Sequence, residues 1–301
     1  MKKAILLALL LALLTLLFVG CGEQDPTLVF MVDGTVFHED VLEEDGELFA
    51  APKPAPEKDG YYFGGWFYDD GTFEQPVNYT DLNKARANKT VYVYAKWEVV
   101  ALRYEEETRT YTVTGLLAGA GTDVVIPAKY GELPVAAIAP DAFRDNTALT
   151  SVTVPDSVTL IGDYAFAGCT SLKEIVLPHT VTEVGKGAFS ACIQLESVRL
   201  SAAMTEILPE TFYNCLSLRT VNVPATVKTI GYRAFSGCAA LTEITIPARV
   251  RTLAGEIFRG TGITELRFAG TVESWASLTK TDFAKDSAIT VVHCTNGDAN
   301  P

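Results

Sequence analysis

The sequence predicts a mainly β protein, in which a solenoid of about six stacked turns with end caps follows a small β domain. A phenylalanine recurs every 23 residues, a cysteine follows it at the same interval, and a proline or serine keeps the interval at the end of a strand-like segment. A fixed period of this length is the sequence signature of stacked repeats. The phenylalanines are Phe143, Phe166, Phe189, Phe212, Phe235 and Phe258.

One full repeat shows how each part is expected to fold. Leu172, Ile175 and Leu177 have the L-x-x-L-x-L spacing of a leucine-rich repeat strand, whose alternate side chains point into the core. Pro178 ends the strand because it has no backbone N–H for a ladder. Phe189 is the bulky side chain that fills the turn. A bend without room for a side chain is expected at Gly162, Gly185 and Gly231.

Departures from the pattern predict the irregular parts of the solenoid. The unit from Ser201 lacks the proline, has Leu208 in place of the glycine and Thr211 in place of an alanine, so we expect it to be the least regular turn. Open solenoid ends need caps because they expose core and strand edges. We expect cap strands at 104–116 and 289–294 and a short helix at 272–278.

The repeats resemble the BspA-like leucine-rich repeat family, whose hallmark is I-P-x-x-V-x-x-I-G-x-x-A-F-x-x-C. The resemblance covers residues 101–297, including both caps, and implies a bacterial surface protein that binds host or bacterial partners without catalytic machinery. The hallmark is matched by Val154, Pro155, Val158, Ile161, Gly162, Ala165, Phe166 and Cys169.

Residues 27–99 are identified as a different kind of domain. The block from Gly60 to Trp66 and the closing Tyr94-Ala95-Lys96-Trp97 resemble the Listeria–Bacteroides repeat, the B-repeat type of module in internalins. The resemblance implies a small β-grasp-like fold on secreted proteins. Its aromatic residues allow two interpretations: Phe63, Trp66 and Trp97 form a core, or a carbohydrate-stacking face is carried by Tyr61, Tyr62, Trp66 and Tyr68.

The start of the chain has the features of an export signal. Lys2 and Lys3 precede the uncharged run from Ala4 to Gly20, which suits a secretory segment better than a membrane span of about 20 residues. Phe18-Val19-Gly20-Cys21 resembles a lipobox. This implies a lipoprotein signal peptide at 1–20, a lipidated Cys21 with a short linker to residue 26, and anchoring at the outer face of the bacterial cytoplasmic membrane or at the cell surface. The alternative is an uncleaved anchor helix.

Charge and motif content exclude several classes of function. The chain carries a net charge of −13 and no basic stripe, so nucleic-acid binding is not expected. The three histidines lie far apart, and no metalloprotease, nucleophile-elbow, phosphate-loop or dinucleotide motif is present. We expect no cofactor, no metal and no enzyme activity; a hydrolase remains a rival without a recognisable site.

Six cysteines in an exported protein first suggest disulfides. Residues stacked at the strand spacing of about 4.8 Å do not meet disulfide geometry without distortion. We therefore expect Cys169, Cys192, Cys215 and Cys238 to be reduced and buried. The alternatives are a metal site or a stack of redox-active cysteines. Cys294 has no partner in this scheme and is also expected to be buried.

The predicted function is non-catalytic adhesion or binding of a protein on a host or neighbouring cell surface. The residues between the inward leucines should form one outward strip, although a solvated strip without a ligand is the plain alternative. A glycan bound by the aromatic first domain is the alternative function. The candidate binding residues are Ser151, Thr153, Glu174, Val176, Ser197, Arg199, Thr220, Asn222, Glu243, Thr245, Glu265 and Arg267.

Overall fold

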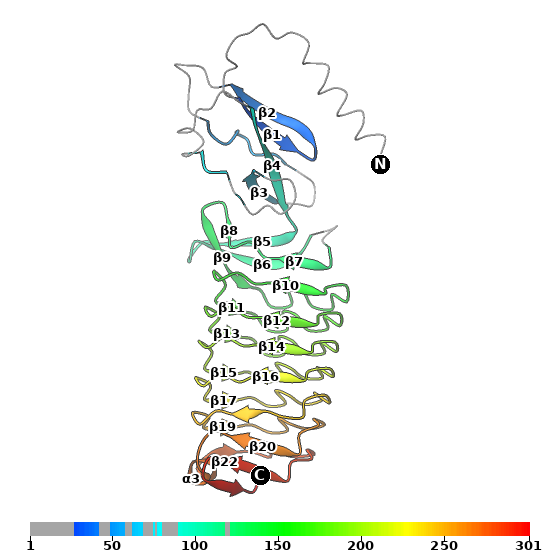
Figure 1. Ribbon diagram of the computed structural model, residues 1–301, viewed down its shortest axis with the longest axis vertical. Coiled ribbons are helices and arrows are strands. Elements are labelled where there is room, and N and C mark those ends of the chain that lie inside the picture. The colour runs from blue at the N-terminus through cyan, green and yellow to red at the C-terminus, as the bar shows by residue number, and fades with distance from the viewer. Residues whose placement is uncertain are drawn as a thin grey trace. The chain divides into compact units, whose positions relative to one another are not determined.

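The computed structural model describes residues 27–41, 49–57, 62–68, 75, 77–79, 90–117 and 121–301. The predicted signal peptide and the lipidated Cys21 lie outside these residues. The chain divides into two compact units, of which the first holds most of a four-stranded sheet and the second holds residues 58–64 and 97–301 (Figure 1).

The first unit is a β sheet in the order β2-β1-β4-β3. β1 is antiparallel to β2 and parallel to β4. Asp33 and Gly34 form the turn between β1 and β2 with φ of 46° and 78°. Phe30 and Trp66 are buried and in edge contact, with ring centroids 4.8 Å apart. The strands are β1 (Thr27–Val32), β2 (Thr35–Val41), β3 (Tyr62–Phe67) and β4 (Thr90–Glu98).

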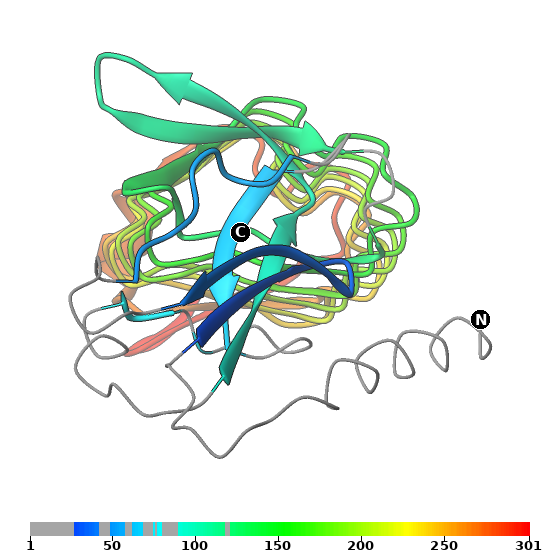
Figure 2. The ribbon, with the colours of Figure 1, turned by 90° about the horizontal axis from the view of Figure 1, so that it is seen from above.

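The second unit is a solenoid with two parallel strand ladders on different sides of each turn (Figures 1 and 2). In the first ladder, equivalent residues of successive repeats pair in register, as Glu174 does with Ser197. The six predicted turns are extended by one strand at each end, so the described residues contain eight strands of this ladder. They are β7 (Asp123–Val125), β10 (Ser151–Thr153), β12 (Glu174–Val176), β14 (Ser197–Arg199), β16 (Thr220–Asn222), β18 (Thr245–Ile246), β20 (Glu265–Phe268) and β22 (Val291–Cys294).

The second ladder is interrupted where the sequence predicts the least regular turn. β13 and β15 belong to separate sheets, and β15 opens the unit that has Leu208 in the glycine position. The strands are β9 (Leu133–Ile138), β11 (Leu160–Ile161), β13 (Glu183–Val184), β15 (Glu206–Ile207), β17 (Thr229–Ile230), β19 (Thr252–Leu253) and β21 (Thr279–Lys280).

A glycine at the bend after this ladder sets how closely two turns approach. A Cβ on Gly162 would lie 2.4 Å from the backbone nitrogen of Pro140 in the preceding turn, and one on Gly185 would lie 2.4 Å from that of Asp163. Phenylalanine rings in turns with this glycine lie 4.9, 5.3 and 5.5 Å from the preceding ring. Where Leu208 or Ala254 replaces it, the distance is 5.7 or 6.1 Å. The two longest ring separations therefore occur in the two turns that lack the glycine.

The core is a continuous stack of the six repeated phenylalanines, all buried. Adjacent rings are parallel to within 7°. The four repeat cysteines are free and buried, as predicted, and Cys294 is only half-buried. The S–H of Cys192 donates to the carbonyl of Phe166 in the preceding repeat at 3.1 Å. Each of the other three thiols likewise donates to the carbonyl of the phenylalanine in the repeat before it. Burial raises the pKa of Cys169 and Cys238 to about 12, so these thiols stay protonated.

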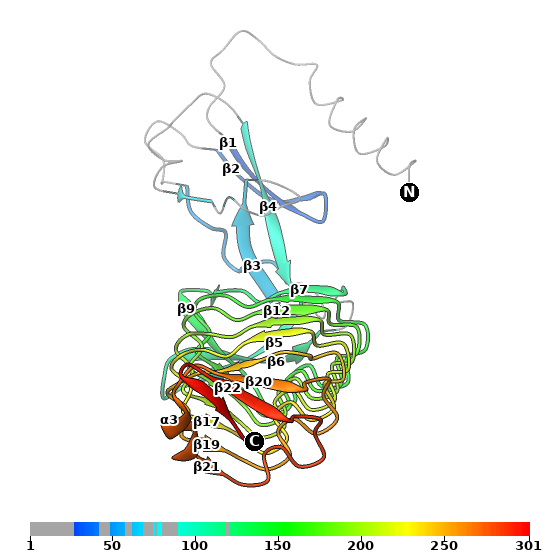
Figure 3. The ribbon, with the colours of Figure 1, turned by 60° about the horizontal axis from the view of Figure 1, so that its bottom comes forward.

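Both ends of the solenoid are capped. At the start, β5 (Val100–Glu105) and β6 (Thr110–Leu116) form an antiparallel hairpin, and β6 pairs with β9. The short strand β8 (Lys129–Tyr130) pairs with the first residues of β9. At the other end, the predicted short helix is α3 (Val272–Ala276), which buries Trp275 (Figure 3). β23 (Gly297–Ala299) closes the last ladder by antiparallel pairing with β22. Within the described ranges, no helix is both long enough and apolar enough to span a bilayer.

Candidate protein-binding face

The twelve predicted binding residues lie along the outer side of the first ladder, which we call the strand face. Their inward neighbours Val152, Ile175 and Val198 are buried. Ser151 and Ser197 are half-buried, and the other ten are exposed. Register places them in two columns, one residue per turn; for example, Arg199 lies beside Val176 on one side and Asn222 on the other.

The strand face extends one turn further at each end than the sequence indicated. β7 adds Asp123 and Val125, which pair in register with Ser151 and Thr153. Asp123 accepts hydrogen bonds from the hydroxyl groups of Ser151 and Thr150 at 2.7 and 2.9 Å, and these bonds hold the pKa of its carboxyl below the usual value. At the other end, Val291 and His293 continue the columns of Glu265 and Arg267. Neither end strand keeps the 23-residue spacing; β22 corresponds to the cap strand predicted at 289–294, whereas β7 was not predicted.

A hollow of about 400 Å³ interrupts the strand face between β16 and β20. Five of the twelve predicted residues lie around it, together with three aliphatic side chains. Val221 at its base is half-buried, whereas Val198 and Ile244 in the adjacent turns are buried. The face hollow is lined by Thr220, Val221, Asn222, Val223, Glu243, Ile244, Thr245 and Arg267.

The face hollow lies at one of the two breaks in the first ladder; the other break is between β10 and β12. β16 ends one sheet and β18 begins another, and β18 starts only at Thr245, so Glu243 lies outside any strand. The core beneath is continuous, because Phe212 and Phe235 remain stacked at 5.5 Å. The break therefore opens the surface of the solenoid without breaking its interior. An aliphatic base with a rim of hydroxyl, amide and charged groups suits an apolar side chain of a protein partner.

His293 bridges the strand face and the end cap. Its Nε2 lies 3.1 Å from Oε2 of Glu265, and its Nδ1 lies 2.8 Å from Oδ1 of Asp298 in β23. A neutral imidazole has one N–H, so only the protonated ring can donate to both carboxylates. The bonds to Asp298 and then Glu265 accordingly raise the pKa of His293 above 6.5. The sequence did not reveal this cluster because its members are brought together only by the stacking of β20, β22 and β23.

We predict that His293 makes the end cap more stable in mild acid. Because the folded-state pKa is raised, the stabilisation is fully present below the unfolded pKa of about 6.5 and is lost as the pH rises through the folded value. The difference in unfolding free energy between the wild type and His293→Gln should therefore shrink as the pH is raised from about 6 to about 9. Denaturant titrations at several pH values measure it. The effect should be modest, because the side chain is 39% exposed; a difference independent of pH would contradict the bridge.

Of the four aromatic residues proposed as a carbohydrate face, the structure describes the side chains of Trp66 and Tyr68. Trp66 is 5% exposed and packs on Phe30, so its ring is not available to stack on a sugar. Tyr68 is half-buried, and the side chains of Tyr61 and Tyr62 lie outside the description. The burial of Trp66 supports the alternative that these aromatics form a core. Across the described ranges, no group of three or more histidine, cysteine, aspartate or glutamate residues is placed to hold a metal ion.

Comparison with known proteins identifies the repeats. The family described as the BspA type leucine rich repeat region matches residues 136–265 and 205–295 in six copies, which together span more than half of the chain. The chain belongs to the BspA-type leucine-rich repeat family. The matched residues include all strands of the strand face from β10 to β22, and they do not include the first unit. The Listeria–Bacteroides resemblance of the first unit therefore stays a prediction.

Solved structures of leucine-rich repeat proteins agree with this assignment. The leucine-rich repeat protein of T. pallidum is 33% identical over 56% of this chain and 78% of its own, with a TM-score of 0.52. A leucine-rich repeat protein of Eubacterium ventriosum is 22% identical over 66% of this chain and 54% of its own, with a TM-score of 0.50, which supports the fold alone. None of the curated proteins compared matches the chain.

Proposed function

We propose that this BspA-type protein is a non-catalytic binding protein that recognises a protein on a host or neighbouring cell through its strand face. The observation that carries the proposal is the face hollow, in which the half-buried Val221 lies within the row of outward residues. Arg267 lies on its rim, and arginine is among the residue types enriched in binding hot spots. The rest of the face is a mixed polar surface typical of the rim of an interface.

The charge pattern of the strand face favours a partner with acidic groups opposite two sites. Arg199 and Arg267 are the exposed arginines of the face, and they lie on opposite sides of the broken ladder. Glu174, Glu243 and Glu265 lie among them, so a partner of uniformly negative charge would be repelled at several positions. Specificity of this kind combines attraction at a few positions with repulsion at others.

Charge reversal tests the face directly. Arg199→Glu with Arg267→Glu should weaken capture of the partner at least tenfold. Both substitutions place a carboxylate opposite the acidic groups that we expect on the partner, and the two negative charges repel each other. Unfolding free energy should change by no more than about 0.5 kcal/mol, because both side chains are exposed. The measurement is binding of the pulled-down partner by surface plasmon resonance.

Lys228→Glu with Arg249→Glu is the matched control for the net charge. Both residues are exposed, and they lie outside the strand face, before β17 and between β18 and β19. This pair should bind as the wild type does. Equal binding by the face pair and the wild type would mean that recognition lies elsewhere, on the caps or the first unit.

We also propose that the protein is a lipoprotein anchored at the bacterial surface through Cys21. The uncharged run before the lipobox supports this proposal, and several acyl chains anchor far more durably than one. Cys21→Ser should release the protein from the membrane fraction and abolish labelling with a fatty-acid analogue. Retention of the variant, together with absence of label on the wild type, would contradict the proposal.

A further inference from the structure

A second hollow, of about 320 Å³, lies on the phenylalanine-turn side of the solenoid, and we call it the turn hollow. It shares no residue with the face hollow. Three successive turns line it, with Tyr213 and Asn214 from the first, Arg233 and Ser236 from the second and Arg259 from the third. This side also carries tyrosines, a residue type that is absent from the twelve predicted residues of the strand face.

Glycines of two successive turns line the turn hollow. The position two residues after each stacked phenylalanine has a positive φ in every repeat, and Asp145, Gly168, Ala191 and Asn214 occupy it in the first four turns. Gly237 and Gly260 occupy it at the turn hollow, with φ of 80° and 67°. A Cβ on Gly260 would meet no atom closer than 3.9 Å. A Cβ on Gly237 would instead collide with the side chain of Asn214, so the open room lies on the Gly260 side of the hollow.

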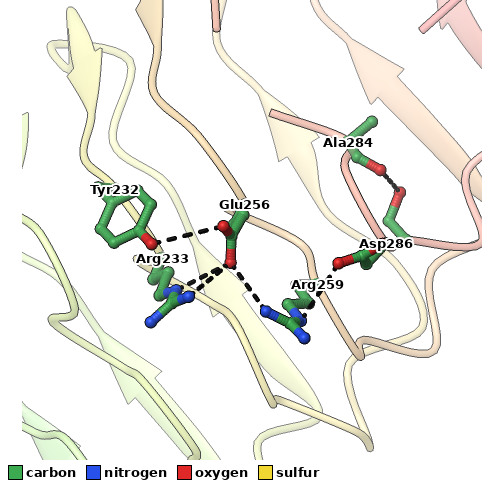
Figure 4. Close-up of polar contacts among 7 residues, drawn as sticks. Tyr232, Arg233, Glu256, Arg259, Ala284 and Asp286 are labelled. Atoms are coloured by element: carbon green, nitrogen blue, oxygen red, sulfur yellow. Dashed lines mark hydrogen bonds and ion pairs between the residues drawn. The ribbon is translucent and has the colours of Figure 1, made fainter. Parts of the chain in front are cut away.

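One carboxylate positions both guanidinium groups of the turn hollow. Arg233 donates from Nε and Nη2 to Oε2 of Glu256 at 2.9 and 2.8 Å, and Arg259 donates from Nη1 to the same oxygen at 3.1 Å (Figure 4). The side chain of Glu256 is 13% exposed, so this anchor lies largely below the surface. The Arg233 guanidinium also lies 4.8 Å from the centroid of the Tyr232 ring. Both arginines are thus held in fixed orientations.

Each guanidinium keeps donors for a ligand. Nη1 of Arg233 and Nη2 of Arg259 have no hydrogen-bond partner among the described residues, and the same holds for the hydroxyl of Tyr213 and the side-chain amide of Asn214. Arg259 has one further neighbour, because its Nε lies 3.6 Å from Oδ2 of Asp286. Prepositioned guanidinium donors are suited to the planar oxygen pair of a carboxylate.

The charge balance selects among anions. Glu256 and Asp286 offset Arg233 and Arg259, so the cluster has no net charge and offers directional donors rather than a strong positive field. A monoanion fits this balance better than a doubly charged phosphate. The remaining lining groups are hydroxyls and an amide beside an aromatic ring, which suit a hydroxylated ring of the size of one sugar.

We propose that the turn hollow binds an acidic monosaccharide unit, with its carboxylate on Arg233 and Arg259 and its hydroxyl groups on Tyr213, Asn214 and Ser236. This site is independent of the protein-binding face. It gives the solenoid a second class of ligand besides a protein partner. It also places sugar binding on the solenoid rather than on the aromatic residues of the first unit.

Calorimetry with D-glucuronate, D-glucose and inorganic phosphate on the full-length protein tests the proposal. Glucuronate should bind at least tenfold more tightly than either of the other two, and the backbone amides of Gly237 and Gly260 should shift in nitrogen–proton correlation spectra. Equal binding of glucuronate and glucose would overturn the carboxylate contact. Phosphate binding as tight as that of glucuronate would overturn the sugar-acid assignment.

Variants locate the site. Arg259→Gln removes an exposed arginine and should reduce glucuronate binding to the level of glucose. Gly260→Asn should do the same by filling the hollow, and the fold should tolerate it because Asn214 holds the equivalent position at φ 58°. Arg144→Gln is the matched control, because Arg144 occupies the same repeat position and pairs with Asp141 as Arg259 pairs with Glu256. Wild-type binding by either Arg259→Gln or Gly260→Asn, or loss in Arg144→Gln, would contradict the assignment.

Discussion

Phe189→Ala should destabilise the solenoid by about 3–5 kcal/mol, the range measured for removing a large aromatic side chain from a core. Phe189 is fully buried, with parallel rings at 5.3 Å on one side and 5.7 Å on the other, so its loss leaves a cavity between two turns. The walls of this cavity are held by the ladders, which limits how far they can collapse. Chemical denaturation followed by circular dichroism gives the free energy.

Leu216→Ala is the control for Phe189→Ala within the same repeats. Leu216 is 48% exposed, so its truncation should change the free energy of unfolding by no more than about 0.5 kcal/mol. Similar, small losses at both positions would mean that the phenylalanine stack is not the core of the solenoid.

Gly185→Ala should cost about 1–3 kcal/mol, as is typical when atoms are forced into a packed site. The added Cβ would lie 2.4 Å from the backbone nitrogen of Asp163, which cannot rotate away as a side chain could. The turns must separate, as they do at Ala254, and we expect faster hydrogen exchange at the paired strands β11 and β13. Urea denaturation and amide exchange measure the two effects.

Gly121→Ala separates this steric effect from a general preference for glycine. No atom lies within 4 Å of a Cβ at Gly121, and its φ is not positive, so the substitution should be nearly neutral. If Gly185→Ala were as stable as Gly121→Ala, the glycine position would not control the spacing of the turns.

The interior of the solenoid could be predicted from the sequence because each of its features repeats. The interval between Phe166 and Phe189 fixes one turn, and the cysteine, proline and glycine positions then follow by the same step. The break between β13 and β15 falls in the turn where Leu208 replaces the glycine, as predicted, although the widest ring spacing, 6.1 Å, is in the turn of Ala254. The strand periodicity also fixed which side chains point outward.

The surface sites could not be predicted in the same way, because they arise where the repetition fails. The face hollow depends on a ladder break beside Val221, whose own repeat keeps the pattern. His293 meets Glu265 only because β22 stacks beside β20 at an irregular interval. The turn hollow needs glycine in two successive turns and arginine on both sides of it. A spacing that repeats along the chain indicates packing in the core, whereas these sites depend on single residues that are brought together from different turns.

Site-specific photo-cross-linking to the captured partner is the most direct test of the strand face. A photo-reactive amino acid at Thr245, on the rim of the face hollow, should form cross-links to the partner that mass spectrometry can identify. The same amino acid at Lys228, which is exposed beside the second ladder, should form none. Cross-links from Lys228 without cross-links from Thr245 would contradict the account, because the partner would then bind away from the strand face.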